Sequence, residues 1–331
     1  MRVLAGDIGG TKTLLQIVDC ANNARRVVAE NRYASGSYDG LVSMLREFLG
    51  SAGLDRASQI HGACFGVAGP ITDIANAQRA QLTNLPWEID TADLARALGT
   101  ERVRLINDFQ AIGYGIEALA PHDVVVLQEG AEIPRAPRVV IGAGTGLGVG
   151  ILVWQRDHYE ALPTEGGHAD FAPTDELQTD LLRYLRETTG HVSYERVLSG
   201  PGILNIYSYL CAGAGQQSDL AAARQADDPA AAIASAALEG KDKLARRALD
   251  VFVMIYGAEA GNLALTCLAR GGVYIAGGIA PKLIDKLGEP AFMRAFNDKA
   301  RMAAVTATMP VRVVMNPAVG LLGASLAAGR L

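Results

Sequence analysis

The feature that most constrains this chain is a pattern of strand, glycine-rich turn and strand that occurs twice. Residues 3–8 lead into Gly9-Gly10 and a strand over 13–18, and residues 139–141 lead into the alternating glycines of 142–148 and a strand ending at Trp154. Each copy predicts a β-hairpin with a tight turn. Because the copies lie about 135 residues apart, they predict two α/β domains built on one plan.

Composition excludes several classes of protein. Half of the 331 residues are hydrophobic and a fifth are charged, so the chain can bury sizeable cores. The net charge of −5, with no run of Lys or Arg, argues against nucleic-acid partners and anionic membrane surfaces. The longest apolar stretch, Val251–Ala258, is too short to span a bilayer. Four widely spaced cysteines form no disulfide or zinc pattern, and we expect reduced thiols in a cytoplasmic protein: Cys20, Cys64, Cys211 and Cys267.

The two glycine turns match neither of the common phosphate-binding motifs. A Walker A loop ends in Gly-Lys-Ser/Thr and opens a helix, whereas here Lys12 follows Thr11 and a strand comes next. The dinucleotide fingerprint also opens a helix, whereas residues 142–150 lead into a strand. Glycine turns can nevertheless direct backbone N–H groups at an anion. One such turn alone favours an ordinary hairpin; two in corresponding positions favour binding of the ATP phosphates from opposite sides of a cleft.

Five segments carry a resemblance to known proteins. Asp7–Thr11 (DIGGT), Gly142–Gly146 (GAGTG) and Ile275–Ile279 (IAGGI) resemble the phosphate-1, phosphate-2 and adenosine motifs of the superfamily of actin, hexokinase and the heat-shock chaperone ATPases. Glu165–Pro173 (EGGHADFAP) and Glu195–Gly202 (ERVLSGPG) resemble the bacterial glucokinase family more closely. The chain lacks the cysteine cluster that follows the Glu-x-Gly-His stretch of the related ROK kinases, so we expect no structural zinc.

The resemblance implies a two-lobed actin-like ATPase fold of the ribonuclease H-like, α/β kind. We expect a small domain from residues 1–110 plus about 311–331, and a large domain from about 111–310, with the ligand cleft between them. Gly320–Gly323 precedes the last expected helix and predicts close helix packing.

Asp108 is the candidate catalytic base. It follows a short buried strand, Val103–Ile106, and precedes a helix, which is where open α/β sheets bind ligands. An Asp there can equally cap the helix, and position alone leaves both readings open. The resemblance favours catalysis, with Asp108 accepting the proton of the sugar 6-hydroxyl and Asn107 binding the sugar.

The candidate sugar-binding residues lie in two loops. Glu165 and His168 flank two glycines, so that loop can approach a small ligand closely. By itself His168 fits a structural histidine, and Glu195 fits a first-turn residue that satisfies a helix dipole. The resemblance implies that Glu165, His168 and Glu195 contact the hexose ring, together with Gly146.

The resemblance also implies ATP and Mg²⁺ as cofactors. Asp7 would hold the ion through water, because Mg²⁺ on a nucleotide keeps several waters. The expected nucleotide contacts are Gly9, Gly10, Thr11, Gly144, Thr145, Gly277 and Gly278.

The resemblance therefore implies an enzyme of the glucokinase family that phosphorylates glucose with ATP. The alternatives are a kinase for mannose or N-acetylglucosamine, a non-catalytic sugar and ATP sensor, and a chaperone-type ATPase; polyphosphate stays open as the donor. The resemblance also suggests a homodimer, and Ile206–Ala214 offers apolar surface for one, although core packing explains the same residues.

Overall fold

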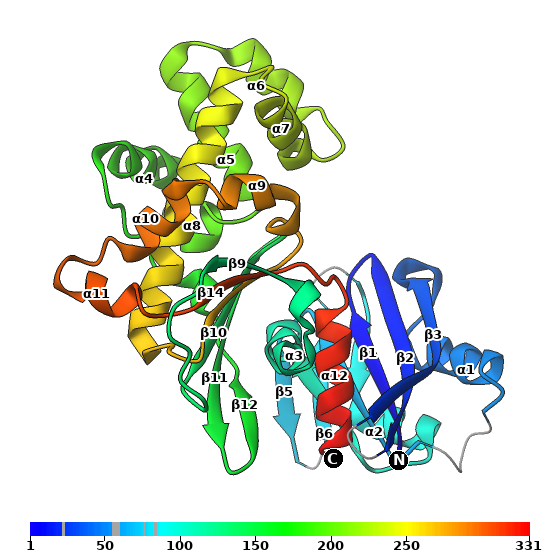
Figure 1. The fold of residues 1–331 in the computed structure, drawn as a ribbon. Helices are drawn as coiled ribbons and strands as arrows, with labels where there is room; N and C mark the ends of the chain where they lie inside the picture. The colour runs from blue at the N-terminus through cyan, green and yellow to red at the C-terminus, as the bar shows by residue number, and fades with distance from the viewer. Residues whose placement is uncertain (22–23, 55–59, 76, 83–84) are drawn as a thin grey trace. The chain divides into compact units, whose positions relative to one another are not determined.

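The computed structural model describes residues 1–21, 24–54, 60–75, 77–82 and 85–331. The chain forms two compact units, each a mixture of sheet and helices (Figure 1). Unit 1 comprises Met1–Pro121, Tyr159–Pro163 and Asn316–Leu331, and unit 2 comprises His122–His158 and Thr164–Met315. The units are described separately below.

The elements of unit 1 lie mostly before residue 121. Its strands are β1 (Arg2–Ile8), β2 (Lys12–Ala21), β3 (Ala24–Ala34), β4 (Gly62–Val67), β5 (Ile71–Ile74), β6 (Ala77–Gln81), β7 (Glu88–Asp90) and β8 (Val103–Asn107). Its helices are α1 (Leu41–Ser51), α2 (Thr91–Leu98), α3 (Asp108–Gly115) and α12 (Val319–Gly329), with 3₁₀ turns η1 (Ser35–Ser37) and η2 (Ile116–Ala118). Pro121–Asp123 (η3) and β12 (His158–Leu162) lie at boundaries between the units.

Unit 2 contains the long helical part of the chain. Its strands are β9 (Val124–Gln128), β10 (Arg138–Ala143), β11 (Leu147–Gln155), β13 (Val273–Ala276) and β14 (Val311–Val314). Its helices are α4 (Glu176–Thr189), α5 (Gly200–Ala214), α6 (Gln217–Arg224), α7 (Pro229–Leu238), α8 (Lys243–Cys267), α9 (Ile284–Leu287), α10 (Pro290–Asn297) and α11 (Ala303–Thr306). Its 3₁₀ turns are η4 (Gly166–His168), η5 (Tyr194–Arg196), η6 (Pro281–Leu283) and η7 (Ala300–Met302).

The main sheets of the two units share one strand plan. In unit 1 the order is β3-β2-β1-β4-β8, with β1 and β2 antiparallel and β1, β4 and β8 parallel. In unit 2, β11 and β10 form the antiparallel hairpin and β10, β13 and β14 are parallel, followed by the antiparallel edge strand β9. The predicted repeat is thereby confirmed, because β2-β1-β4-β8 corresponds to β11-β10-β13-β14.

Unit 1 buries the faces that its hydrophobic periodicity predicts. In α1, Leu41, Met44, Leu45 and Phe48 recur at helical spacing and are all buried. All six residues of β4 are buried, as is typical of a central parallel strand covered on both faces. Unit 1 also contains a separate small sheet, formed by β5, β6 and β7.

Helix α12 packs against α3 at glycines (Figure 1). A Cβ added to Gly323 would lie 1.7 Å from the carbonyl oxygen of Ala111, and one added to Gly115 would lie 2.0 Å from that of Val319. Both distances are far below any van der Waals contact, so the two helices can approach this closely only because these positions lack side chains. The predicted close packing of the Gly320–Gly323 segment is confirmed, but the segment lies within the first turns of α12 rather than before the helix.

Helix α8 forms the centre of the unit 2 core. By length and hydropathy it is the one helix among the described residues that could cross a membrane, but 72% of its apolar window is buried within the protein. Asp242 caps its N-terminus by accepting from the backbone N–H groups of Leu244 and Ala245 at 2.7 and 3.1 Å. The apolar character of α8 is therefore explained by core packing.

Candidate active site

In unit 1, three predicted site residues lie at one edge of the sheet. The parallel strands β1, β4 and β8 bring Asp7 opposite Gly66 and Asn107 opposite Val67. The carboxyl ends of these strands therefore carry Asp7, Asn107 and, one residue further, Asp108. This is the edge at which open α/β sheets bind ligands.

The turn that follows Asp7 is held from behind by a buried serine. The backbone N–H of Gly9 donates to the carbonyl of Lys12 at 3.0 Å, which closes the hairpin that contains Gly10 and Thr11. The hydroxyl of Ser35 donates to the carbonyl of Gly9 at 2.8 Å, and the N–H of Ser35 donates to the carbonyl of Thr11 at 3.1 Å. Ser35 is a supporting residue that the sequence analysis missed, because its partners are met only once β3 pairs with β2.

Asn107, rather than Asp108, caps helix α3. The side-chain oxygen of Asn107 accepts from the backbone N–H of Phe109 at 2.8 Å, and Gln110 completes a capping box by accepting from the N–H of Asn107 at 3.0 Å. The carboxylate of Asp108 accepts from the neighbouring N–H of Phe109 at 2.9 Å. Asn107 therefore supplies the cap of α3, and Asp108 shares the N–H of Phe109 with it.

In unit 2, the second glycine turn is hydrogen-bonded to Glu195, one of the predicted sugar-binding residues. Oε2 of Glu195 accepts from the backbone N–H of Leu147 at 2.9 Å. A Cβ on Gly146 would lie 2.4 Å from the same oxygen, so a glycine is required for Glu195 to come this close. The N–H of Gly144 donates to the carbonyl of Gly146 at 2.8 Å, which fixes the turn containing Thr145.

The loop containing Glu165 and His168 lies against this turn. Nδ1 of His168 is 4.0 Å from Oε1 of Glu195, and its Nε2 is 4.0 Å from Oε2 of Glu165. A Cβ on Gly167 would lie 2.0 Å from the carbonyl oxygen of Leu147, so the loop packs directly on β11. Three of the four polar side chains predicted to contact the sugar, those of Glu165, His168 and Glu195, thus gather around one turn.

Next to the same turn, unit 2 contains a cavity of about 710 Å³. The second turn and the third glycine motif both contribute, through Gly144, Thr145 and Gly278. Gly277 has φ +81°, and a Cβ there would lie 2.4 Å from the carbonyl oxygen of Ala143, so this glycine allows the two motifs to pack together. Residues that the sequence analysis did not assign also line the cavity: Pro201, Ile203, Leu204, Asp227, Asp228 and Lys282.

Asp228 shows why these residues were missed. The Asp228-Pro229 pair predicts a helix start, and Asp228 does cap α7 by accepting from the N–H of Ala231 at 3.0 Å. The pair gives no local signal that this loop folds back to the cavity. Its place there depends on how α7 packs beside α5 and α8.

The donor set fits a magnesium ion held mainly by a nucleotide. Burial raises the pKa of Asp7, while the charge of Lys12 acts to lower it. Among the described residues, no group of three or more His, Cys, Asp or Glu side chains could hold a metal ion. One carboxylate beside a glycine turn is the kind of site that Mg²⁺ uses when phosphates and water supply the remaining ligands.

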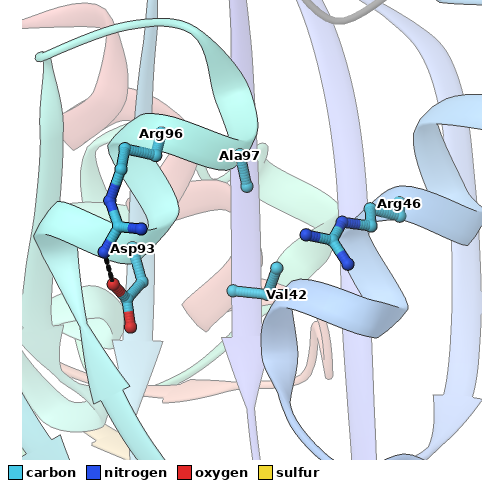
Figure 2. Close-up of a pocket in the computed structure, with 5 residues that line it drawn as sticks. All are labelled: Val42, Arg46, Asp93, Arg96 and Ala97. Carbon is cyan, nitrogen blue, oxygen red and sulfur yellow. Dashed lines mark hydrogen bonds and ion pairs between the residues drawn. The ribbon is translucent and has the colours of Figure 1, made fainter.

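A smaller hollow of about 370 Å³ lies in unit 1, between α1 and α2 (Figure 2). It is lined by Val42, Arg46, Asp93, Arg96 and Ala97, and Arg96 pairs with Asp93 within it. None of the predicted site residues contributes to this hollow, and we assign it no part in the site.

The two sheets with one strand plan, each carrying a glycine turn between the two strands of its antiparallel hairpin, define the class of protein as an actin-like ATPase fold. Comparison with known proteins narrows the class. The family model described as Glucokinase matches residues 4–331. A curated glucokinase of Nostoc sp. is 46% identical over 345 aligned positions, covering 99% of each chain. The chain belongs to the glucokinase family.

Solved structures agree with this assignment. The crystal structure of a glucokinase from an Antarctic psychrotroph has a TM-score of 0.86 at 30% identity, covering 100% of this chain and 99% of the other. That of a glucokinase from Balamuthia mandrillaris, solved with glucose, has a TM-score of 0.79 at 21% identity, covering 99% of this chain and 93% of that one. The second likeness shows the fold alone, and the two together confirm the predicted fold class.

Proposed function

We propose that this chain transfers the γ-phosphoryl group of ATP to the 6-hydroxyl of glucose. Membership of the glucokinase family supports the reaction. The observation that carries the proposal is the position of the second glycine turn within unit 2. Glu195 lies against Gly146 of this turn and within 4.0 Å of His168, which is 4.0 Å from Glu165, while Gly144 and Thr145 of the same turn line a cavity of about 710 Å³.

That arrangement suits a sugar on one side of the turn and a nucleotide on the other. Carboxylates and an imidazole are suitable partners for vicinal hydroxyl groups, because they accept and donate hydrogen bonds in fixed directions. Backbone N–H groups of a glycine turn suit phosphates. A turn shared by both groups would align the sugar with the transferred phosphoryl group, which is most of what phosphoryl transfer requires of a protein.

We assign the role of general base to Asp108. Its carboxylate takes the proton from the 6-hydroxyl as the sugar oxygen bonds to the γ-phosphorus, and the bond from that phosphorus to the bridging oxygen breaks to release ADP. Asn107 donates to the sugar from its amide nitrogen, since its side-chain oxygen already caps α3.

Gly9, Gly10 and Thr11 contact the phosphates, and Gly277 and Gly278 contact the adenosine. Asp7 would hold Mg²⁺ through water, and the ion, when bound, would neutralise charge on the phosphates.

A coupled assay of ADP release with ATP, Mg²⁺ and a panel of hexoses tests the reaction. We expect turnover with glucose and values of kcat/KM at least about 10²-fold lower with mannose and N-acetylglucosamine, because polar sites reject altered hydroxyl patterns strongly. Polyphosphate in place of ATP should give no glucose 6-phosphate. Equal or faster turnover with another hexose would reassign the substrate, and binding of glucose and ATP without sugar-dependent ADP release would identify a sensor.

We further propose that the protein is a cytoplasmic homodimer. The four cysteines are all free thiols, as suits a reducing compartment. Ile206 and Tyr207 are buried within unit 2 and so provide no surface for a partner, whereas Leu238, at the end of α7, is 53% exposed. Light scattering after size exclusion should give twice the chain mass of 34.8 kDa; the mass of one chain would rule out the dimer.

A further inference from the structure

A carboxylate is buried on helix α8 in unit 2. Glu259 lies on α8 and is 4% exposed. A buried carboxylate is costly unless hydrogen bonds and charges compensate it. Nδ2 of Asn262, one turn further along α8, donates to its Oε2 at 3.1 Å, and the ammonium group of Lys299 attracts it electrostatically.

Lys299 reaches this region from the segment after α10. Its Nζ donates to the carbonyl of Ala258 at 3.0 Å. A Cβ on Gly261 would lie 2.8 Å from its Cε, so the lysine stem passes over α8 at a glycine. The titratable groups that face Glu259 are therefore Lys299 and, from η5, Tyr194.

Tyr194 connects this buried group to the sugar loops. Its hydroxyl accepts from Nδ2 of Asn262 at 3.1 Å, and the same nitrogen donates to Oε2 of Glu259 at 3.1 Å, so Asn262 bridges the two groups. Burial and the nearby Glu259 carboxylate both raise the pKa of Tyr194, so its hydroxyl stays neutral. The three side chains satisfy one another, and a fully satisfied buried network favours a single arrangement.

The backbone of Tyr194 then fixes both sugar loops. It directly precedes Glu195, and its N–H donates to the carbonyl of Ala169, the residue after His168, at 2.9 Å. Its ring packs edge-on against Phe171, with centroids 5.8 Å apart. The N–H of Leu198 donates to the carbonyl of Tyr194 at 2.7 Å, which closes the turn around Glu195. A shift of Tyr194 would therefore displace Glu195 and His168 together.

We propose that Glu259 is a positioning residue for sugar binding, acting through Tyr194 on the loops that carry Glu195 and His168. The inference rests on the proposed function, because it takes these two side chains to contact glucose. Glu259 itself touches no substrate. The network it forms holds the two loops in one relative position, and its loss should weaken glucose binding while ATP binding is kept.

Three variants test the proposal. Glu259→Leu keeps a similar size but removes the acceptor, Tyr194→Phe removes the linking hydroxyl, and Glu259→Gln keeps an oxygen acceptor. We expect KM for glucose to rise about 10-fold in Glu259→Leu and Tyr194→Phe, the scale of one lost hydrogen bond to a charged group. KM for ATP should change less than about twofold, and Glu259→Gln should restore most of the glucose affinity.

Tyr207→Phe is the matched control. Tyr207 is also buried and its hydroxyl donates to a carboxylate that caps α8, Asp242, at 2.5 Å, but it lies at the other end of the helix. This variant loses the same group and should lower the thermal midpoint without changing KM for glucose. The double variant Glu259→Leu/Tyr194→Phe should bind glucose about as weakly as either single variant, because each substitution breaks the same connection between Glu259 and Tyr194.

Glucose titration of the wild-type protein separates failure of the two ideas. If the wild type neither binds nor phosphorylates glucose, the proposed function fails. If the wild type is active but Glu259→Leu and Tyr194→Phe retain the wild-type KM for glucose, or weaken ATP and glucose equally, Glu259 is structural and the inference is overturned. Thermal midpoints of all variants confirm that folded protein is being compared.

Discussion

The Glu195 carboxylate accepts a hydrogen bond of 2.9 Å from the backbone N–H of Leu147, and this bond joins a loop at residue 195 to the glycine turn at residue 146. One oxygen of the carboxylate is thus engaged by the turn, while Oε1 faces His168 at 4.0 Å. A glycine before Leu147 is what permits the approach, because a Cβ there would lie 2.4 Å from Oε2.

Substitution of Glu195 should therefore affect glucose more than ATP. In Glu195→Ala, a sugar acceptor and the partner of the Leu147 N–H are lost together, and we expect KM for glucose to rise about 10- to 100-fold. Glu195→Gln keeps an oxygen that can accept from Leu147, so its rise should be smaller. Steady-state kinetics with each substrate varied in turn measure both effects, and an unchanged KM for glucose in Glu195→Ala would remove this residue from the sugar site.

The nucleotide assignment can be tested at a glycine that no protein atom crowds. A Cβ on Gly144 would have no protein atom within 4 Å, so Gly144→Ala should fold with an unchanged thermal midpoint. If this turn contacts phosphates, the added methyl group should raise KM for ATP about 10-fold or more while KM for glucose changes little. Gly213→Ala, on an exposed part of α5 and equally uncrowded, should leave both constants unchanged. Equal behaviour of the two variants would argue against phosphate contact at Gly144.

Stability should show a pH dependence that originates at Asp90. Its carboxylate accepts from the backbone N–H of Ala92 at 2.7 Å and from Arg79 at 2.8 Å, and both bonds lower the pKa of Asp90. A carboxyl group whose pKa is lowered by folding stabilises the folded state when the pH is above the pKa of the unfolded chain. That stabilisation is lost as the pH falls through the lowered pKa of the folded state. Asp90→Ala should cost about 1 kcal/mol near pH 7, and the difference should shrink below about pH 4.

Urea unfolding over a pH series measures this difference. Asp90→Asn provides the control, since an amide oxygen can still cap α2 without titrating. A difference between wild type and Asp90→Ala that stays constant down to acid pH would show that the ionised cap is not its source.

The sequence predicted those parts of the fold that depend on local pattern. The hairpins after residues 8 and 143 and the apolar face of α1 follow from glycine positions and hydrophobic spacing. The fold class and the family were predicted from motif order. The small β5-β6-β7 sheet was not predicted, because Ala77–Gln81 has little strand propensity and pairs only in the folded unit.

The site shows the same division. Glu195, His168 and Gly146 were expected near one ligand, but the bond from Leu147 to Glu195 joins residues 48 apart and becomes visible only in the structure. Ser35 behind the first turn and Glu259 beneath Tyr194 are ordinary residues in the sequence and acquire a role only through packing. Asp108 shows a different limit, since the sequence did not reveal that its neighbour Asn107 caps α3 and that both side chains accept from the N–H of Phe109.

The central claim is that Asp108 accepts the proton of the glucose 6-hydroxyl, and Asp108→Asn tests it most directly. Because Asn107 caps α3, the substitution should leave the fold intact, and Asp93→Asn serves as a matched change at an exposed carboxylate of the same unit. The measurement is kcat for glucose phosphorylation alongside calorimetric binding of glucose and ATP. We predict a loss of about 10²-fold or more in kcat with both affinities kept; near-normal turnover would contradict the assignment.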